Sequence, residues 1–596
     1  MKLKFILAIT VGSLSLSLAQ LTNLQTGDID VMADADNGGS VTGVTFNDDY
    51  QVYMVENAAN WVAGTNYILT APLYVFDADG GDPAVLTIEA GTTVYSTGVD
   101  SDPESDNFGA IIVSQSGQIF AEGTADAPIK FTTIRSLEAT DGVDRDGDGI
   151  TTAPALTDRG FWGGLILLGD AQVANFETTF EVGGVSFPKA EMINVIEGFP
   201  APDSNSNDFD DNGLNDLITY GTTAFPNNGH SAGVLRYVSI AHGGVDLGDG
   251  NEINGLTLGG VGSGTTLEYI EVLSNADDGI EFFGGTADLK YALVAYQSDD
   301  SLDLDEGYSG NIQFFANIQN TDDVDTAGNS VQDSDHGGEW DGNVSGDSGD
   351  FTSSPVISNF TFIGDATGDH AFNIDDFFSG EVYNGVVTNY ADLVRVTTDF
   401  DSADTVTFGS IVHDVAEVNG GTSGSNTTAE SQLSSDIGSA VTDVQIGLID
   451  TLGDSYDPTP VAGSPALTTT PVDVNAINSF FENVSYLGAF AEGQNWAIGW
   501  TCSDSVFGIF NVSSSRNVTI VDGEINRGAT SFITFEAGAG SYVLTESADL
   551  SVDSFVDSIT GITDGGNLDV DSVTGEITVE FTASSADEFF YRIEEE

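Results

Sequence analysis

Between about residue 85 and residue 420 the chain alternates short apolar runs with polar turns. The runs are mostly four to seven residues long and rich in Val, Ile, Leu, Phe and Tyr, and Gly, Asn and Asp separate them. Short runs of this kind between turn residues are typical of β-strands. No long stretch of this region has the apolar spacing of an amphipathic helix. The pattern therefore predicts an all-β region of many short strands.

One strand pattern returns along the chain, at offsets of 22 or 23 residues in its last three copies. The run Leu267–Val272 returns as Leu289–Val294 and again as Ile312–Asn317, at offsets of 22 and 23 residues, and Leu235–Ile240 is an earlier copy. A period near 22 with two or three short strands in each unit predicts the coils of a right-handed parallel β-helix. A β-sandwich is the alternative, but the strands of a sandwich do not usually keep the same 22- or 23-residue spacing in both halves of a repeat unit.

Stacked coils would bring equivalent residues of successive units together. Their strands would lie about 4.8 Å apart, so the Leu, Tyr and Ile positions of the repeat would stack inward. The positions between them would point outward, and opposite charges would be neighbours in one outward row, as cross-strand pairing favours. The members of this row are Arg236, Glu268, Lys290 and Gln313.

Changes of amino-acid composition and of strand pattern along the chain predict five regions. Residues 415–440, rich in Ser, Thr and Gly, are expected to form a mobile loop. The predicted regions are a signal peptide at 1–19, an N-terminal cap region at 20–84, the parallel β-helix with acidic loop insertions at 85–473, an aromatic C-terminal cap at 474–502 and a small β-sandwich module at 503–596.

The first residues have the organisation of a secretory signal. Lys2 and Lys4 precede an apolar run from Phe5 to Leu18, and Ser17-Leu18-Ala19 forms a small-x-small cleavage site. No later segment reaches the roughly 18 apolar residues that a membrane-spanning helix needs. We therefore expect a secreted protein, extracellular or at the cell surface, without a membrane span.

Composition excludes several classes of partner and site. There are 13 Lys and Arg residues against 94 Asp and Glu, a net charge of −81, which excludes broad electrostatic attraction to nucleic acid or anionic lipid. Hydrophobic residues make up 40% of the chain, so it is not an acidic disordered tail. The single Cys502 excludes internal disulfides and thiolate zinc clusters.

Five short motifs stand out within residues 85–501. They are F-W-G-G at 161–164, N-E-I-N-G-L-T-L-G-G at 251–260, N-A-D-D-G-I-E-F-F-G-G at 275–285, S-D-D-S-L-D-L-D-E-G at 298–307 and N-W-A-I-G-W-T at 495–501. These motifs resemble those of exported bacterial parallel β-helix proteins of the pectin-lyase-like kind found at cell surfaces. The resemblance implies the β-helix fold and export more strongly than any one activity. It assigns no role to a particular residue.

Pairs of aspartates recur at the period of the coils. They are Asp277 with Asp278, Asp299 with Asp300, and Asp322 with Asp323. If these pairs stack, like charges lie about one strand spacing apart, which raises carboxylate pKa values or recruits a cation. Calcium suits such a column because it takes six to eight oxygen ligands in flexible geometry. The alternative is that the pairs lie in solvated turns and point apart.

Two loops have the carboxylate spacing of calcium-binding loops. The first is Asp144-x-Asp146-x-Asp148-Gly149, and neither loop has the final Glu of an EF-hand. The second loop offers Asp208, Asp210, Asn212 and Asp216. At least one of the two loops is expected to bind structural calcium, and an acidic surface loop without an ion is the alternative.

The favoured functional hypothesis is a non-enzymatic, calcium-stabilised β-helix scaffold. It would serve adhesion, matrix contact or glycan binding, so its partner would be a polysaccharide or a component of the cell surface or matrix. A surface-layer assembly protein is one alternative, to be recognised by calcium-dependent oligomers. The oligomeric state, the ligand and the role of the C-terminal module stay open.

A carbohydrate-active enzyme is the other alternative. Parallel β-helices host polysaccharide lyases and polygalacturonase-like hydrolases, and paired carboxylates are the usual acid and base of glycoside hydrolysis. If the chain is an enzyme, Asp299, Asp300 and Asp278 would be its catalytic residues. A lyase also needs a basic residue near these aspartates. Arg236 and Lys290 are the candidates, and the outward row already accounts for both, so the absence of enzymatic activity is favoured.

Overall fold

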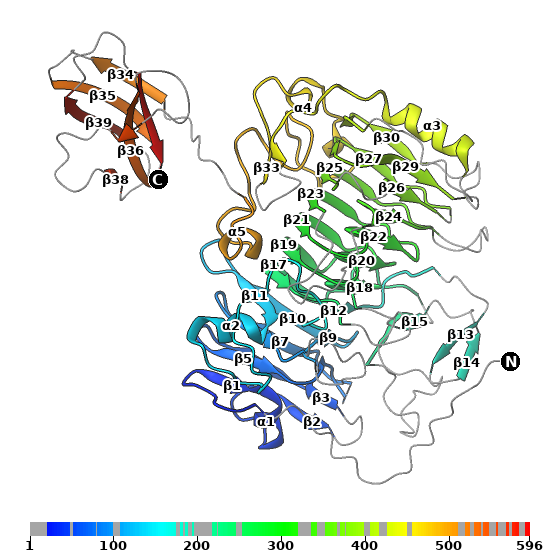
Figure 1. The fold of residues 1–596 in the computed structure, drawn as a ribbon. Helices are drawn as coiled ribbons and strands as arrows, with labels where there is room; N and C mark the ends of the chain where they lie inside the picture. Colours follow the sequence, from blue (N-terminus) through cyan, green and yellow to red (C-terminus); the bar gives the residue numbers. More distant parts are fainter. Residues whose placement is uncertain are drawn as a thin grey trace. The chain divides into compact units, whose positions relative to one another are not determined.

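A computed structural model gives the fold of the chain (Figure 1). It describes residues 21–47, 52–78, 80–98, 108–174, 179–182, 185–188, 193–195, 217–222, 225–245, 253–319, 335–342, 352–365, 370–375, 377–397, 406–415, 426–449 and 456–510, and the backbone of seven later strands. The chain divides into two compact units, Met1–Asp454 with Pro458–Ile509, and Ser455–Asp457 with Phe510–Glu596. The predicted signal peptide lies outside the described residues.

The first unit is a parallel β-helix with three strand faces. Long strands bend midway and so belong to two faces at once: β17 (Gly233–Ala241), β19 (Thr266–Leu273), β21 (Asp288–Ala295), β23 (Asn311–Ile318) and β25 (Val356–Ile363). Their registers follow the repeat, because Leu235, Leu267, Leu289 and Ile312 are direct partners on successive coils. The all-β class and the parallel β-helix predicted from the repeat are confirmed.

Shorter strands extend the first and second faces in both directions. The first face adds β4 (Ala58–Trp61), β7 (Ala84–Ile88), β10 (Gly117–Glu122), β27 (Glu381–Tyr383) and β30 (Thr407–Gly409). The second face adds β1 (Asp28–Asp30), β5 (Asn66–Leu69), β8 (Thr93–Ser96), β11 (Ile129–Thr133), β28 (Val386–Thr388) and β31 (Val412–His413).

The third face is a separate sheet of 11 strands, parallel except for its first pair. In spatial order it contains β2 (Thr45–Asn47), β3 (Val52–Val55), β6 (Leu73–Val75), β9 (Ile111–Val113), β12 (Leu165–Leu168), β18 (Leu256–Gly259), β20 (Ile280–Phe283), β22 (Leu302–Asp305), β24 (Glu339–Trp340), β26 (His370–Ile374) and β29 (Asp392–Val396). Parallel pairing thus begins inside residues 20–84, the region expected as an N-terminal cap.

The inward side chains of the three faces form one continuous apolar core. Leu235, Leu267, Leu289 and Ile312 are at most 1% exposed, as the repeat predicts. Fully buried Trp61 and Trp340 also belong to this core. Burial of apolar area in successive coils stabilises the stack, since one coil alone cannot bury its own inner surface.

The tyrosines of the repeat do not point inward, so that part of the prediction is wrong. Tyr237, Tyr269 and Tyr291 have φ values of 48°, 56° and 60° and form the corner between the first and second faces. A left-handed residue reverses the alternation of side chains along a strand, which places these rings outside the core. The rings of successive coils stack with centroids 4.3 and 4.5 Å apart.

Residues 474–509, here called the side segment, pack along this corner. Trp500 is 1% exposed and meets the ring of Tyr237 edge-on at 5.5 Å. Lys290 donates to the Phe480 carbonyl oxygen at 3.0 Å and pairs with Glu482 at 3.1 Å. The segment expected to cap the last coil therefore lies along the sides of several coils.

The remaining elements are short. Residues 415–440, expected as a loop, contain the helix α3 (Thr427–Ile437). The others in the first unit are α1 (Val31–Asp36), α2 (Ile134–Asp141), α4 (Pro465–Thr468), η1 (Val474–Ala476), α5 (Cys502–Ser505), β13 (Thr179–Val182), β14 (Val185–Pro188), β15 (Ile193–Val195), β16 (Thr219–Gly221) and β32 (Ile446–Ile449), with β33 (Tyr456–Pro460) following. Among the described residues no helix has the length and apolar character needed to cross a bilayer.

The second unit contains two antiparallel sheets, as a small β-sandwich requires. One sheet has the order β34 (Thr519–Glu524), β35 (Thr530–Ala537), β39 (Gly575–Thr582). In the other, β36 (Gly540–Ser547) pairs with β37 (Val556–Asp557), β38 (Leu568–Val570) and β40 (Phe590–Glu595).

Candidate functional site

The aspartate pairs of two successive coils lie in the turns that lead into the third face. Asp278 directly precedes the turn into β20, and Asp300 holds the equivalent place before β22. The Asp278 Oδ1 accepts a hydrogen bond from the Asp300 backbone N–H at 2.9 Å. Gly279 leaves room for Val294 beside this turn, because a Cβ there would lie 2.3 Å from Val294 Cγ1. The predicted stacking of these two pairs is therefore present.

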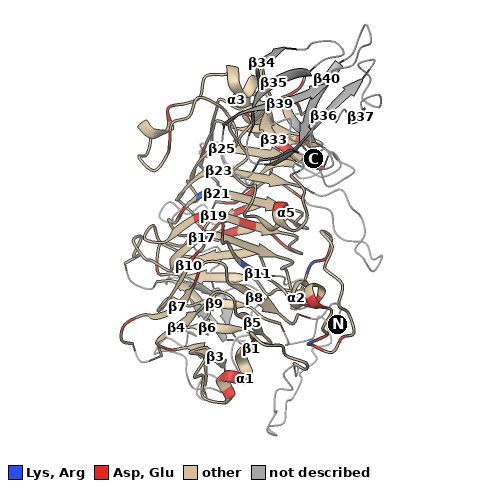
Figure 2. Cartoon of the chain, turned by 90° about the vertical axis from the view of Figure 1, so that its left-hand side faces the viewer, with Lys and Arg blue, Asp and Glu red and all other residues tan. Residues whose placement is uncertain are grey.

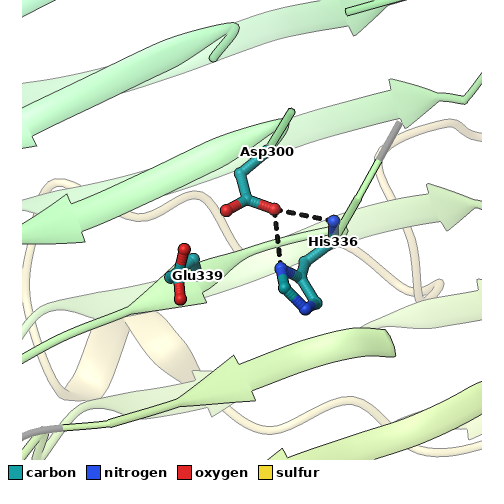
Figure 3. A group of neighbouring side chains, drawn as sticks. All are labelled: Asp300, His336 and Glu339. Carbon is teal, nitrogen blue, oxygen red and sulfur yellow. Dashed lines mark hydrogen bonds and ion pairs between the residues drawn. The ribbon is translucent and has the colours of Figure 1, made fainter. Parts of the chain in front are cut away.

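The next coil continues this column with a histidine. Asp300 Oδ1 accepts hydrogen bonds from the His336 backbone N–H at 2.6 Å and from His336 Nδ1 at 2.9 Å (Figure 3). Asp278, Asp300 and His336 are 7%, 2% and 5% exposed. Each carboxylate thus fixes the backbone of the following coil while remaining almost entirely out of water.

A second column of acids runs beside the first on the strands themselves. Glu281, Asp303 and Glu339 are direct register partners on β20, β22 and β24. Asn254 donates to Glu281, and Asn373 Nδ2 donates to Glu339 Oε1 at 2.5 Å. We call the two columns together the acidic face. Its members are Asp278, Asp300, Glu281, Asp303 and Glu339.

Burial and mutual repulsion raise the pKa values of the three aspartates of this face, Asp278, Asp300 and Asp303. Burial, and then the neighbouring aspartates, raise the pKa of Asp278 well above its ordinary value. The pKa of Asp300 is raised by burial and then by Glu339, and the pKa of Asp303 by burial and then by Glu281. Carboxylates set so closely must share protons or bind a cation.

Three sets of side chains on this face are close enough to hold one ion each. In each set the ligand atoms lie within 4.8 Å of one another. The sets are Asp277 with Asp278 and Asp299, Asp278 with Glu281 and Asp303, and Asp300 with His336 and Glu339. The first two offer only oxygen, which suits hard cations such as calcium, and the third adds an imidazole nitrogen.

The structure also brings together the carboxylates of the first predicted ion loop. Asp144, Asp146 and Asp148 lie within 4.8 Å of one another and of Glu138, a residue of α2 that the loop spacing did not indicate. Asp144 Oδ1 accepts from the Gly147 N–H at 2.7 Å, where Gly147 has a φ of 85°.

Some predicted ligands cannot be placed. Asp208, Asp210, Asn212, Asp216, Asp322 and Asp323 lie outside the described residues. The third aspartate pair and the second ion loop therefore stay predictions.

Sequence reasoning missed two arginines beside the acidic face. Arg395 is the register partner of Asn373, which is itself the partner of Glu339, so the acid column ends in a cation two coils further on. Arg159 Nη1 donates to the hydroxyl of Ser298, next to Asp299. The 22-residue step from Asn373 to Arg395 repeats the period of the coils and could have indicated Arg395.

Comparison with known proteins agrees with the fold. A family model described as a pectate-lyase-like beta helix domain matches residues 54–191 and 205–448. A search of curated proteins finds no match to the chain.

Proposed function

Because the chain belongs to the pectate-lyase-like β-helix family, we propose that it is an exported protein that binds a hard divalent cation and polysaccharide through the acidic face. The single observation that carries the proposal is the convergence of five carboxylates from three successive coils on one face of the β-helix. The proposed role is that of a non-enzymatic scaffold for adhesion, matrix contact or glycan binding.

A bound cation would resolve the electrostatic conflict on the acidic face. Asp278, Asp300 and Asp303 all have raised pKa values, first because of burial and then because of neighbouring acids. Calcium accepts six to eight oxygens, so it can use these carboxylates and retain positions for sugar hydroxyls or carboxylates. Since the chain carries a net charge of −81, such a bridge would also allow an acidic polysaccharide to approach.

The test is retention of the full chain on a panel of immobilised neutral and acidic polysaccharides, with calcium or with a chelator. We expect retention on at least one polysaccharide in calcium and loss of retention in the Glu281→Gln/Asp303→Asn variant. The matched control is Glu122→Gln/Glu268→Gln, which removes two outward carboxylates that pair with Arg236 on another face. Absence of retention of the folded wild type on every polysaccharide would contradict the proposal.

A specific observation supports a second candidate, a carbohydrate-active enzyme. The sequence offered no convincing basic residue beside the aspartates. In the structure, Arg395 continues the row of register partners on the third face that contains Glu281, Asp303 and Glu339. An acid with a raised pKa can donate a proton to a leaving sugar oxygen. Under this candidate Asp299, Asp300 and Asp278 supply the acid and base.

The enzymatic candidate predicts release of reducing ends or unsaturated products from a polysaccharide in the presence of calcium. Turnover that disappears in the Asp299→Asn/Asp300→Asn variant and falls at least about 100-fold in Arg395→Ala would establish it. Retention without turnover in the wild type would favour the scaffold.

A further inference from the structure

A second group of acids lies away from the third face, in the loop that follows α2. The helix ends at Gly142, and the chain then turns through Asp144, Asp146 and Asp148. Carboxylate oxygens of these three residues and of Glu138 lie within 4.8 Å of one another. We call these four residues the loop cluster. None of them belongs to the acidic face.

Glu138 is the unusual member of the loop cluster, because it is 0% exposed. Its Oε1 accepts backbone N–H groups from Arg145 at 2.5 Å and from Asp146 at 3.4 Å. Its Oε2 is buried and has no hydrogen-bond partner among the described residues. A buried carboxylate oxygen without a partner has lost its hydration without gaining a hydrogen bond in return, which destabilises the fold. This oxygen is therefore available to a ligand that the protein itself does not supply.

Of the two neighbouring arginines, Arg145 is engaged with acids outside the loop cluster, and Arg135 reaches one member of it. The Arg145 guanidinium pairs with Asp28 and with Asp141, each at 2.7 Å. Arg135 lies over the ring of Phe161, 4.5 Å from its centroid, and reaches Asp148 at 3.6 Å, at the edge of the loop cluster. One guanidinium at this distance leaves most of the negative charge of four carboxylates uncompensated.

We infer that Glu138, Asp144, Asp146 and Asp148 form a calcium site that fastens the N-terminal segment of the chain to the β-helix. Four carboxylates can supply at least four of the six to eight oxygens that calcium takes, and water can supply the rest. Magnesium is disfavoured, because it demands near-ideal octahedral geometry and keeps most of its own waters.

The loop that carries these ligands also holds the first described residues of the chain. The Thr22 backbone N–H donates to the Arg145 carbonyl oxygen at 2.6 Å, and Asn23 Nδ2 donates to the Asp144 carbonyl oxygen at 3.0 Å. Asp28, the partner of Arg145, begins the edge strand β1. Because an edge strand presents unpaired backbone groups, a cation that rigidifies the loop would protect this end of the sheet.

The experiment is a calorimetric calcium titration of the full chain, paired with limited proteolysis. In the wild type we expect calcium to slow cleavage within residues 21–30 and 142–152 at least about tenfold. In Glu138→Gln one equivalent of bound calcium should be lost, together with this protection. Asp126→Asn, which neutralises an exposed acid outside the loop cluster, should behave as the wild type does.

A second variant keeps the test valid if Glu138→Gln folds poorly. Asp144→Asn/Asp148→Asn leaves the hydrogen bonds of Glu138 in place and should lose the same equivalent. The Glu281→Gln/Asp303→Asn variant should keep loop protection, which separates this site from the acidic face. Equal stoichiometry and equal protection in the wild type and in both loop-cluster variants would overturn the inference.

Discussion

The corner tyrosines hold a backbone conformation that is usually left to glycine or asparagine. A left-handed residue with a side chain costs on the order of 1–2 kcal/mol, and Tyr237, Tyr269 and Tyr291 repeat that cost on three coils. Their stacking at 4.3 and 4.5 Å offsets part of it, at about 0.5–1.5 kcal/mol for each aromatic pair. The edge-on contact of Trp500 with Tyr237 adds to this. Aromatic stacking thus maintains the bend between the first and second faces.

His242 predicts a pH dependence of stability. Burial lowers the pKa of His242 to about 4 from an ordinary 6.5, while its Nδ1–H donates to the Asp158 carbonyl oxygen at 2.7 Å. Between pH 6.5 and about pH 4, His242 therefore binds a proton in the unfolded chain but not in the folded chain. The stability associated with neutral His242 is complete above pH 6.5, falls as the pH drops, and is reduced by roughly 3 kcal/mol at pH 4.

The measurement is urea unfolding of wild type and His242→Asn between pH 4 and pH 9. Asn tolerates the left-handed conformation of this position, where φ is 64°. The stability difference between the two proteins should shrink by roughly 3 kcal/mol from pH 7 to pH 4 and stay constant above pH 7. A difference that is constant over the whole range would refute the assignment to His242.

The limits of sequence reasoning about single residues have a physical cause. The leucine column Leu235, Leu267, Leu289 was predictable, because direct partners in a parallel stack share one periodic position. The tyrosines two positions later were placed on the wrong side, because alternation along a strand assumes extended backbone throughout. A positive φ is a backbone property that the side-chain pattern does not reveal.

At the scale of elements, the side segment is the part of the β-helix unit that fastens several coils at once. Glu271 of β19 accepts backbone N–H groups of Cys502 at 2.5 Å and Ser503 at 2.8 Å, at the start of α5. This carboxylate is 0% exposed, and burial raises its pKa. Docking of the segment therefore combines a buried carboxyl contact with the aromatic contacts of Trp500.

Removal of the Trp500 ring should loosen the side segment. Trp500→Ala is expected to lower the free energy of unfolding by about 3–5 kcal/mol, because the ring is fully buried against two tyrosines. The measurement is urea unfolding followed by tryptophan fluorescence, which reports on the first unit, where all five tryptophans lie. Ile498→Ala, 37% exposed in the same segment, should change the midpoint little. Equal midpoints for the two variants would refute the docking role.

Insertions between coils explain which elements of the site escaped prediction. Glu281 and Asp303 are 22 residues apart, but Asp303 and Glu339 are 36 apart, although each pair consists of direct neighbours in the sheet. A search at the period of the coils therefore stops at Asp303. Glu138 escaped for a different reason, since it belongs to the helix α2, which precedes the carboxylate spacing of the first ion loop.

At the scale of the whole molecule, acidic residues dominate the charge. Asp and Glu number 94 against 13 Lys and Arg, and Figure 2 shows acidic positions on many strands and turns of the described chain, with few basic ones. Like charges at this density destabilise a compact fold through mutual repulsion. Three of the described arginines pair with acids, but they offset only a small part of this repulsion. They are Arg135 of α2, Arg145 of the loop after it and Arg236 of β17.

Ionic conditions should therefore shift the melting temperature. Raising NaCl from about 0.01 to 0.5 M should raise the Tm by at least about 2 °C, because the screening length falls from roughly 30 Å to below 8 Å. Calcium at millimolar concentration should raise the Tm further at matched ionic strength, and a chelator should reverse this second increment. A Tm that responds equally to calcium and sodium at one ionic strength would argue against specific cation sites.

The uninterrupted register between β19 and β23 has a consequence for how such a chain can change its length. Residues 266–310 make two complete turns of the β-helix, so a tandem duplication of this cassette would rejoin the stack without altering any strand partner outside it. Duplication of one turn alone would place Glu268 or Lys290 beside its own copy. Duplication of both keeps the charges of the outward row in alternation. The cassette would also bring another copy of Glu281 and Asp303, so the number of carboxylates on the acidic face can grow by recombination in steps of two turns.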